Sequence, residues 1–505
     1  MADYHFAMGL LILFGFIVTY SAIPVLRRVA LEYEVVSAPG GRRSHNKPTP
    51  LLGGLAIFLP FAAVFITFYI LVITGQIDLS QPTRVQMLAL FLGTTWILIL
   101  GTWDDKAQFG WRLKLAGQAL GAAILVLGGH NIVRATLPFI GPVEFGWYGI
   151  PLFVLAVIAI TNAINLIDGM DGLAGGICFF AALTSAVIGL AKGDFFTATI
   201  GFTIVGSLLG FLMFNLPPAS IFMGDGGSMM MGFLLGTLAT SFAAISPGQR
   251  LGTSVMIVAP FLPFGIPLFE VALSIVRRLV RGQAVFLGDG DHLHNRLRGK
   301  IEDPKLAVGV FYFFSAALCA LTLFSVLGRD STLAQFVGAA IALVILGGII
   351  GSIRLYNVRE LALTLRNRPH FKFLGGFLRF MKRRMRRAES LHELLALLET
   401  GVRDLHFDKV EVLSDGDVLF RWVSSRLVHP GNRRVYSEES LSDGRIIVKW
   451  WQPFHDDETY NEYLMLTWYR LLVAMRREIA HQELQFFPAQ KNNVIELPGK
   501  HTSKT

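Results

Sequence analysis

The sequence predicts an all-α, polytopic integral membrane protein that carries a small α+β domain at its C-terminal end. Of its 505 residues, 53% are hydrophobic and only 16% are charged, whereas a soluble globular protein has roughly 25% charged residues. The apolar residues come in runs of about 17 to 25, and each run is long enough to cross a hydrocarbon core of about 30 Å. These runs stop well before the C-terminus, where the sequence becomes polar.

The apolar runs predict about eleven membrane-spanning helices. No basic segment precedes the first run, and it is too long for the core of a signal peptide, so we expect it to be retained as a span. The expected spans are residues 6–26, 51–74, 86–103, 113–128, 147–166, 172–190, 196–214, 229–245, 253–276, 306–326 and 333–355.

The basic residues between these runs indicate the orientation. If the N-terminus lies outside, the short inner loops hold about 15 Lys and Arg, as the positive-inside rule requires. The outer loops then hold only Arg84, Arg134, Lys192, Arg250 and Arg329. We therefore expect the N-terminus outside and the C-terminus in the cytoplasm.

The C-terminal part differs in composition from the rest of the chain. We predict a transmembrane catalytic domain at 1–355, a basic linker at 356–372, a cytoplasmic α+β domain at 373–487 and a disordered tail at 488–505. Within the α+β domain we expect a basic amphipathic helix at 374–401, short strands separated by Asp-Gly turns, and a long helix near 459–484. Its order of helices and strands is GAF-like, which suggests a regulatory or assembly module.

The net charge of +9 is concentrated in this C-terminal part, which includes the basic run Lys382, Arg383, Arg384, Arg386 and Arg387. In a soluble protein such a cluster would suggest nucleic acid. Beside a membrane it favours anionic lipid, which attracts each basic residue by about 1 kcal/mol. We therefore predict no nucleic-acid partner.

The two cysteines both lie inside apolar runs, which argues against a disulfide framework and against thiol metal ligands.

Two motifs place acidic side chains at predicted inner loops. The first is Asp104-Asp105, followed by Lys114. Adjacent carboxylates at the end of a span are costly unless a cation compensates them, so they indicate a metal or proton-transfer role or, alternatively, a solvated acid pair. The second motif contains Asn162, Asn165, Asp168 and Asp171 where two predicted spans meet. The spacing of three keeps the first three side chains on one side of a helix end.

Further motifs fall on the same predicted face. Asp225 stands between Gly224 and the pair Gly226-Gly227, a composition that lets the backbone approach a phosphate or a cation closely.

The loop containing His292, His294 and Arg296 offers cationic donors for a pyrophosphate, or is an ordinary exposed loop. Arg42 and His45 precede the second span. They could hold a lipid phosphate or serve only as positive-inside anchors.

These segments, in this order, resemble the polyprenyl-phosphate N-acetylhexosamine-1-phosphate transferase family (glycosyltransferase family 4) over about residues 35–300. The resemblance implies one cytoplasmic cleft in a bacterial inner-membrane protein, which binds a UDP-N-acetylhexosamine, Mg²⁺ and a polyprenyl phosphate. Mn²⁺ is a candidate substitute, and a homodimer is an option for the assembly. The histidine loop resembles the branch that transfers N-acetylglucosamine 1-phosphate to undecaprenyl phosphate in the synthesis of envelope glycans such as O-antigen, teichoic acid or capsule.

The resemblance also implies roles for single residues. It assigns Asn165 and Asp225 to Mg²⁺, Lys114 to phosphate, and Asp104, Asp105 and Asp168 to catalysis. The histidine motif of the family ends in a further histidine, where this chain has Asn295, so a role for that position is not carried over. We assign the remaining candidates to substrate binding: Asn162, Asp171, His292, His294, Arg296, Arg42 and His45.

Three questions stay open at the level of the sequence. Either Asp104 deprotonates the lipid phosphate, or Asp104 and Asp105 orient Lys114. The transfer proceeds by direct attack of the lipid phosphate or through an aspartyl phosphate on Asp168. The alternative functions are a phospho-MurNAc-pentapeptide transferase of peptidoglycan synthesis and, in another class, a multi-span solute transporter.

Overall fold

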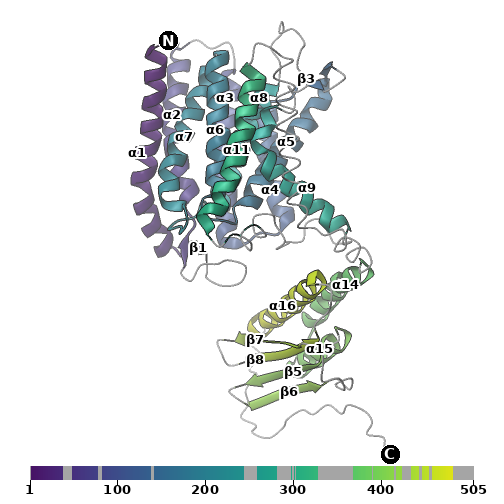
Figure 1. Cartoon of the computed structure of the whole chain (residues 1–505). Helices are drawn as coiled ribbons and strands as arrows, with labels where there is room; N and C mark the ends of the chain where they lie inside the picture. The colour runs from purple at the N-terminus through teal and green to yellow at the C-terminus, as the bar shows by residue number, and fades with distance from the viewer. Residues whose placement is uncertain are drawn as a thin grey trace, which may run out of the picture. The chain divides into compact units, whose positions relative to one another are not determined.

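The computed structural model of the chain describes residues 2–37, 48–77, 82–137, 141–243, 259–280, 297, 301, 303–327, 368–388, 390–405, 407–414, 417–423, 434–442, 446–453 and 458–481. These residues form two compact units. The first is a bundle of long helices, and the second is a small α+β unit (Figure 1). Each is described by itself below.

The helical unit contains most of the predicted spans. Its helices are α1 (Ala2–Glu32), α2 (Gly53–Ile73), α3 (Arg84–Ala107), α4 (Trp111–Leu127), α5 (Gly149–Ile167), α6 (Leu173–Lys192), α7 (Phe195–Asn215), α8 (Gly224–Ala243), η2 (Ala259–Phe264), most of α9 (Gly265–Val280) and α11 (Pro304–Leu327). Short elements connect them: β1 (Val36–Ser37), β2 (Thr49–Pro50), the hairpin β3 (Arg134–Leu137) and β4 (Gly141–Glu144), and η1 (Gly146–Tyr148).

The protein is a polytopic helical membrane protein, but the structure does not reproduce the predicted number of spans. By length and composition, seven helices among the described residues can cross a membrane: the helices α1, α2, α3, α5, α6, α7 and α11. The predicted spans at 113–128 and 229–245 correspond to α4, with only 17 residues, and to α8, whose first turn carries Asp225. The span at 333–355 and the start of that at 253–276 lie outside the described residues, so the count of about eleven stays a prediction.

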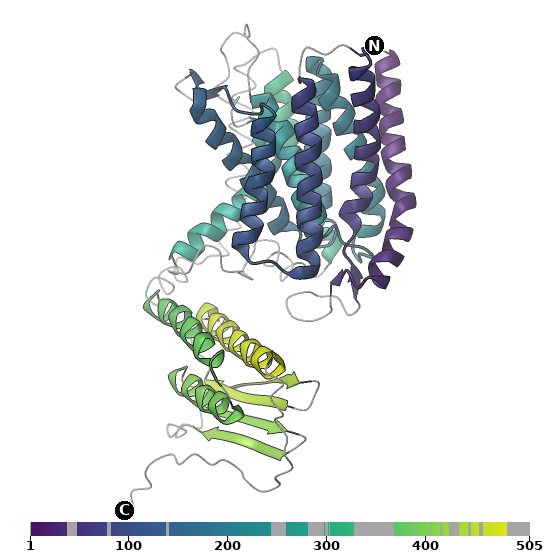
Figure 2. The same cartoon turned by 180° about the vertical axis from the view of Figure 1, so that it is seen from behind.

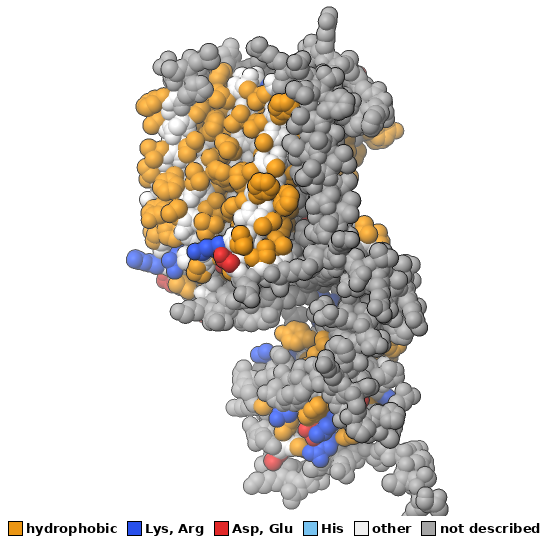
Figure 3. Space-filling model, in the orientation of Figure 1, with side chains coloured by type: hydrophobic (Ala, Val, Ile, Leu, Met, Phe, Trp, Pro, Cys, Tyr) orange, Lys and Arg blue, Asp and Glu red, His pale blue; other side chains and the backbone are white. Residues whose placement is uncertain are grey.

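The surface of this unit suits a lipid environment. Helix α1 forms the outer edge in both views and packs on α7 and α2 (Figure 1, Figure 2). Along its other side, large apolar side chains such as Phe6, Leu13 and Val25 are more than half exposed. Figure 3 shows hydrophobic side chains over this face of the bundle, with charged side chains gathered at one end. Exposed apolar surface of this extent is typical of protein that faces lipid.

Glycines let the first turn of α8 pack tightly against α2 and α3. A Cβ on Gly101 of α3 would lie 2.5 Å from the carbonyl oxygen of Asp225, and one on Gly54 would lie 2.2 Å from the Cα of Gly227. Neither distance is compatible with a side chain. Gly224, just ahead of Asp225, has φ +74°, a backbone conformation that favours glycine. The Gly-rich motif around Asp225 therefore serves backbone packing, which fixes the position of that carboxylate.

The second unit has its own hydrophobic core. Its four antiparallel strands are β5 (Lys409–Ser414), β6 (Asp417–Val423), β7 (Arg434–Ser442) and β8 (Ile446–Pro453), in the order β6-β5-β8-β7. The helices α14 (Arg368–Met385), α15 (Leu391–Asp404) and α16 (Glu458–His481) complete it. Val410, Val448 and Trp450 from the sheet and Trp468 from α16 share one buried cluster.

Two details of this unit differ from the sequence prediction. The single helix expected at 374–401 is wrong, because the chain forms two helices, and the side chain of Ser390 caps the second by accepting from the backbone N–H of Glu393. A serine that accepts from the third residue after it is a common helix start. Strand β7 was not expected, because its sequence is largely polar.

We predict that Gly101→Ala destabilises the helical unit. The added methyl group meets the backbone of Asp225, and such overpacking costs about 1–3 kcal/mol. Thermal unfolding of the detergent-solubilised protein measures the effect. Gly9→Ala in α1 is the matched control, because nothing lies within 4 Å of a Cβ there. Equal unfolding temperatures for the two variants would contradict the packing argument.

Candidate active site

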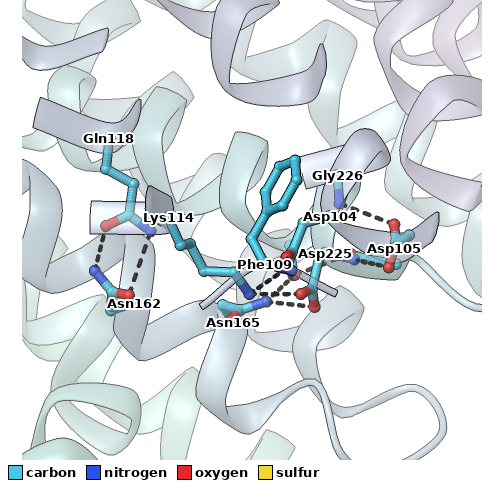
Figure 4. A network of polar contacts seen from close by, with 11 residues as sticks. Asp104, Asp105, Phe109, Lys114, Gln118, Asn162, Asn165, Asp225 and Gly226 are labelled. Atoms are coloured by element: carbon cyan, nitrogen blue, oxygen red, sulfur yellow. Dashed lines mark hydrogen bonds and ion pairs between the residues drawn. The ribbon is translucent and has the colours of Figure 1, made fainter. Parts of the chain in front are cut away.

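Four helix ends meet at one end of the helical unit and bring polar side chains together. The end of α3 supplies Asp104 and Asp105, the start of α4 supplies Lys114, the end of α5 supplies Asn165, and the start of α8 supplies Asp225 (Figure 4). Residues from three of the motifs identified in the sequence thus converge. Short turns between α3 and α4, including Gln108 with φ 50°, reverse the chain and hold the first two elements together.

Lys114 is the centre of this cluster. Its ammonium group lies 2.5 Å from Oδ2 of Asp104 and 2.7 Å from Oδ2 of Asp225. The Asp104 side chain is only 5% exposed, and its other oxygen, Oδ1, accepts the backbone N–H of Phe109 at 2.6 Å. Both oxygens of Asp104 are therefore engaged within the protein, which supports a role in orienting Lys114.

Asp105 points away from Lys114, although it is adjacent to Asp104 in sequence. Its Oδ1 accepts the backbone N–H of Asp225 at 2.9 Å, and its Oδ2 accepts that of Gly226 at 3.3 Å. Backbone N–H groups in the first turn of a helix have no partner within the helix. Asp105 thus acts as a cap on α8 from a different helix, and the two neighbouring aspartates have different surroundings (Figure 4).

Amide side chains lie on the side of Lys114 that is away from Asp105. Asn165 donates through Nδ2 to Oδ1 of Asp225 and to Oγ of Ser228, both at 2.9 Å. One turn earlier in α5, Asn162 exchanges two hydrogen bonds with Gln118 of α4, at 2.6 and 3.3 Å. Gln118 and Ser228 were missed in the sequence analysis. The position of Gln118, four residues after Lys114 on one helix face, is a signal that could have found it.

The turn between α5 and α6 carries the other two acidic candidates. Asp168 ends α5 and is partly exposed. Oδ2 of Asp171 accepts the backbone N–H of Ala219 at 2.9 Å and so ties this turn to the segment before α8.

A cavity of 310 Å³ opens beside Asp171. Met170, Asp171, Pro217, Pro218, Asp303, Pro304 and Lys305 line it. Oδ1 of Asp171 receives no hydrogen bond from the described residues. This oxygen is therefore available to a ligand in the cavity.

The remaining predicted site residues lie outside the described residues: Arg42, His45, His292, His294 and Arg296. The flanking chain is described. Pro50 accepts the backbone N–H of Phe222 at 2.8 Å, and Leu297 packs against the core of the helical unit. The chain that follows each of these segments thus belongs to the helical unit.

The cluster has an excess of negative charge. Asp104, Asp105 and Asp225 each carry one formal negative charge and Lys114 carries one positive charge, so the formal charge of the cluster is −2. Both oxygens of Asp225 accept hydrogen bonds, from Lys114 and Asn165, but unlike Asp104 this side chain is 34% exposed, so its remaining lone pairs face outward. The amide oxygen of Asn165 receives no hydrogen bond from the described residues. Mg²⁺ prefers oxygen ligands, keeps several waters and needs only one or two protein side chains beside substrate phosphates. This donor set fits such an ion.

A metal held by protein side chains alone is not indicated. Within the part of the chain that the structure describes, no group of three or more His, Cys, Asp or Glu side chains is arranged to hold a metal ion. A divalent ion at Asp225 and Asn165 would therefore depend on oxygens from the substrate or water to complete its shell.

Comparison with known proteins agrees with this geometry. The family model for glycosyl transferase family 4 matches residues 87–243, which include Asp104, Lys114, Asn165 and Asp225. A probable undecaprenyl-phosphate N-acetylglucosaminyl 1-phosphate transferase of Bacillus subtilis is 34% identical over 291 residues, which cover 57% of this chain and 76% of the relative. The chain belongs to glycosyl transferase family 4. It is therefore a transferase enzyme of a membrane protein family.

Two other relatives are named for a different lipid acceptor or for a different transferred sugar. A decaprenyl-phosphate N-acetylglucosaminephosphotransferase of Mycobacterium leprae is 34% identical over 299 residues, covering 56% of this chain and 74% of the relative. A phospho-N-acetylmuramoyl-pentapeptide-transferase of Halalkalibacterium halodurans is 31% identical over 293 residues, covering 55% of this chain and 84% of the relative.

We predict that Asp105→Asn weakens the start of α8. The amide can still accept one backbone N–H, but its NH₂ group faces the other, and a buried donor without an acceptor costs about 1–3 kcal/mol. The unfolding temperature and the activity should both fall, since Asp225 lies in the affected turn. Asp194→Asn, at the N-cap of α7, is the control for activity. Full stability together with lost activity would show that Asp105 acts in the chemistry instead of as a cap.

Proposed function

We propose that this protein transfers N-acetylglucosamine 1-phosphate from its UDP-sugar to a polyprenyl phosphate, undecaprenyl phosphate in particular, and releases UMP. The transfer would be an early membrane step in the synthesis of an envelope glycan. The observation that carries the proposal is the Lys114 cluster, in which Asp104 and Asp225 flank one ammonium group at an end of the helical unit. The relatives named above support the sugar and the lipid acceptor.

In this proposal the main obstacle is repulsion between two phosphate-bearing reactants. Asp225 and Asn165 would hold Mg²⁺, with Mn²⁺ as a candidate substitute, and the ion would neutralise phosphate charge and favour departure of UMP. Lys114 would stabilise the charge on the transferred phosphate. Asp104 would keep the ammonium group of Lys114 in position, since both Asp104 oxygens are engaged inside the protein.

We propose direct attack by the lipid phosphate. An oxygen of that phosphate forms a bond to the β-phosphorus of the UDP-sugar while the bond to the UMP oxygen breaks. A lipid phosphate is already largely ionised near neutral pH, because its second pKa is about 6, so no protein base is required. The engaged state of Asp104 supports this. The covalent route through Asp168 is the alternative, and UMP to UDP-sugar exchange without lipid would favour it.

The donor would extend from the cluster into the cavity beside Asp171. A carboxylate suits the hydroxyls of a ribose, which need acceptors, and Lys305 at the cavity offers a cation. We further propose that Asn162, Arg42, His45, His292, His294 and Arg296 complete the substrate sites. The two histidines and Arg296 would contact the pyrophosphate.

We propose that the site faces the cytoplasm of a bacterial cell, at the inner membrane, with the N-terminus outside. The distribution of basic residues along the sequence supports this orientation. The C-terminal α+β unit would then also be cytoplasmic, and a regulatory role for it and a homodimeric assembly stay predictions. Membership of a transferase family argues against the transporter alternative. The lower identity to the phospho-N-acetylmuramoyl-pentapeptide-transferase makes that function the second choice.

Purified protein should release UMP from UDP-N-acetylglucosamine only when both polyprenyl phosphate and Mg²⁺ are present. Chelation with EDTA should stop the release, and added Mg²⁺ should restore it. Asp225→Asn should lower kcat by about 100-fold or more, because the cluster loses the negative charge that would hold the ion. Asp194→Asn should retain activity. Unchanged turnover after chelation would refute the metal-dependent reaction, and activity with UDP-MurNAc-pentapeptide alone would favour the second choice.

Asp171→Asn tests the placement of the donor. The variant keeps an acceptor for the N–H of Ala219 but loses the charge that would strengthen bonds to ribose hydroxyls. Such a hydrogen bond contributes about 1.5–3 kcal/mol, so KM for the UDP-sugar should rise by about tenfold or more while kcat changes little. KM for the lipid phosphate serves as the internal control. An unchanged KM for the UDP-sugar would place the nucleoside elsewhere.

A further inference from the structure

Helix α14 of the second unit has two faces of different chemistry. One face packs into the core of that unit through buried side chains: Leu374, Phe377, Met381 and Met385. Phe373 and Phe380 lie beside this face and are 50% and 53% exposed, and the ring of Phe373 stacks on that of Phe377, with 5.7 Å between the centroids. Phe373 and Phe380 are seven residues apart, so they lie on the same side of the helix. Two exposed phenylalanines on one helix face are an unusual feature for a unit in contact with water alone.

The same helix carries several exposed arginines, most of them in the turns that follow Phe380. Arg379, Arg383, Arg384, Arg386 and Arg387 are all exposed. The guanidinium group of Arg384 lies over the ring of Phe380, 5.9 Å from its centroid. Between Arg368 and Ala388 the sequence contains no Asp or Glu. The outer face of α14 is therefore both cationic and aromatic.

This combination fits the interface of an anionic bilayer. Interfacial helices carry Lys and Arg on their polar side and place Phe, Trp or Leu in the boundary between headgroups and acyl chains. Among its described residues the same chain has seven helices that can cross a membrane, so α14 is covalently tethered to a membrane protein and need not find lipid by free diffusion. Nucleic acid or an acidic protein would match the charge of the arginines. Neither explains two exposed phenylalanines as well as an acyl-chain boundary does.

We propose that the outer face of α14, formed by Phe373, Phe380 and the neighbouring arginines, binds the surface of an anionic membrane. Phe373 and Phe380 enter the headgroup region, while Arg383, Arg384 and Arg387 contact lipid phosphates. The proposal concerns a part of the chain outside the family match at residues 87–243, and it does not depend on which sugar or lipid acceptor the enzyme uses.

A spin label on the full-length protein tests this directly. Phe380→Cys introduces an exposed thiol, while the native Cys178 and Cys319 are both buried. The labelled protein is placed in nanodiscs of phosphatidylcholine, with or without phosphatidylglycerol. The label's accessibility to oxygen and to a water-soluble nickel chelate then reports its depth. We expect the label at membrane depth when phosphatidylglycerol is present and in water when it is absent. Val423→Cys, on an exposed part of β6, is the control that stays in water.

Charge reversal provides a second measurement. Arg383→Glu with Arg387→Glu should return the Phe380→Cys label to water, since each lost positive charge lowers the ratio of bound to unbound helix by about fivefold. Arg476→Glu, at an exposed position of α16, is the matched control and should leave the label at membrane depth. A label that stays in water with both lipid compositions would overturn the proposal. The proposal would also be overturned if the label were shielded from oxygen and from the nickel chelate equally in both lipid compositions and if the two glutamate substitutions had no effect. The label would then lie against protein.

Discussion

The charge of the Lys114 cluster is the constraint on which the functional end of the helical unit depends. Three carboxylates and one ammonium group lie together where four helices end, with a formal charge of −2. Taking charges out of water is costly unless opposite charges and hydrogen bonds compensate them. The protein supplies part of that compensation through Lys114 and through the backbone N–H groups of Phe109, Asp225 and Gly226. The remaining negative charge is what a divalent cation would compensate.

The packing around this cluster explains why so many glycines occur near the acidic motifs. The first turn of α8 can approach α2 and α3 only because Gly54, Gly101 and Gly227 lack side chains. The approach brings the N–H groups of α8 within reach of Asp105 and turns Asp225 toward Lys114. Backbone packing and electrostatics are thus coupled, because a shift of α8 would change the distance between Asp225 and the ammonium group.

The second unit is stabilised separately, by a hydrophobic core of its own. It buries its own apolar side chains between one sheet and the helices, with Trp450 and Trp468 in the core. On the outer side of α14, Phe373 and Phe380 are about half exposed on a helix that also carries several exposed arginines. An enzyme that works on a lipid substrate stays in the bilayer through its spanning helices. A surface helix adds a contact whose strength depends on the lipid charge, which would make the position of this unit sensitive to membrane composition.

The sequence by itself determined the membrane class, because long apolar runs have few alternatives to spanning helices. It also singled out Asp104 and Asp105, because adjacent carboxylates at the end of a span are costly without a compensating cation. Spacing and glycine context drew attention to Asn165 and Asp225, and the family resemblance assigned roles to these two and to Lys114. The sequence could not separate Asp104 from its neighbour Asp105, and it missed Gln118 and Ser228.

Only the tertiary structure decided those points, since they depend on contacts between residues far apart in the chain. Lys114 and Asp225 are separated by 111 residues, and Asp105 and Gly226 by 121. Periodicity and hydropathy describe a residue's neighbours along one helix, whereas the role of a carboxylate depends on which groups another helix brings to it. The presence of β7 escaped the sequence for the same reason, because its pairing with β8 determines it. The break between α14 and α15 was instead a missed local signal, since Ser390 caps α15 through Glu393, three residues later.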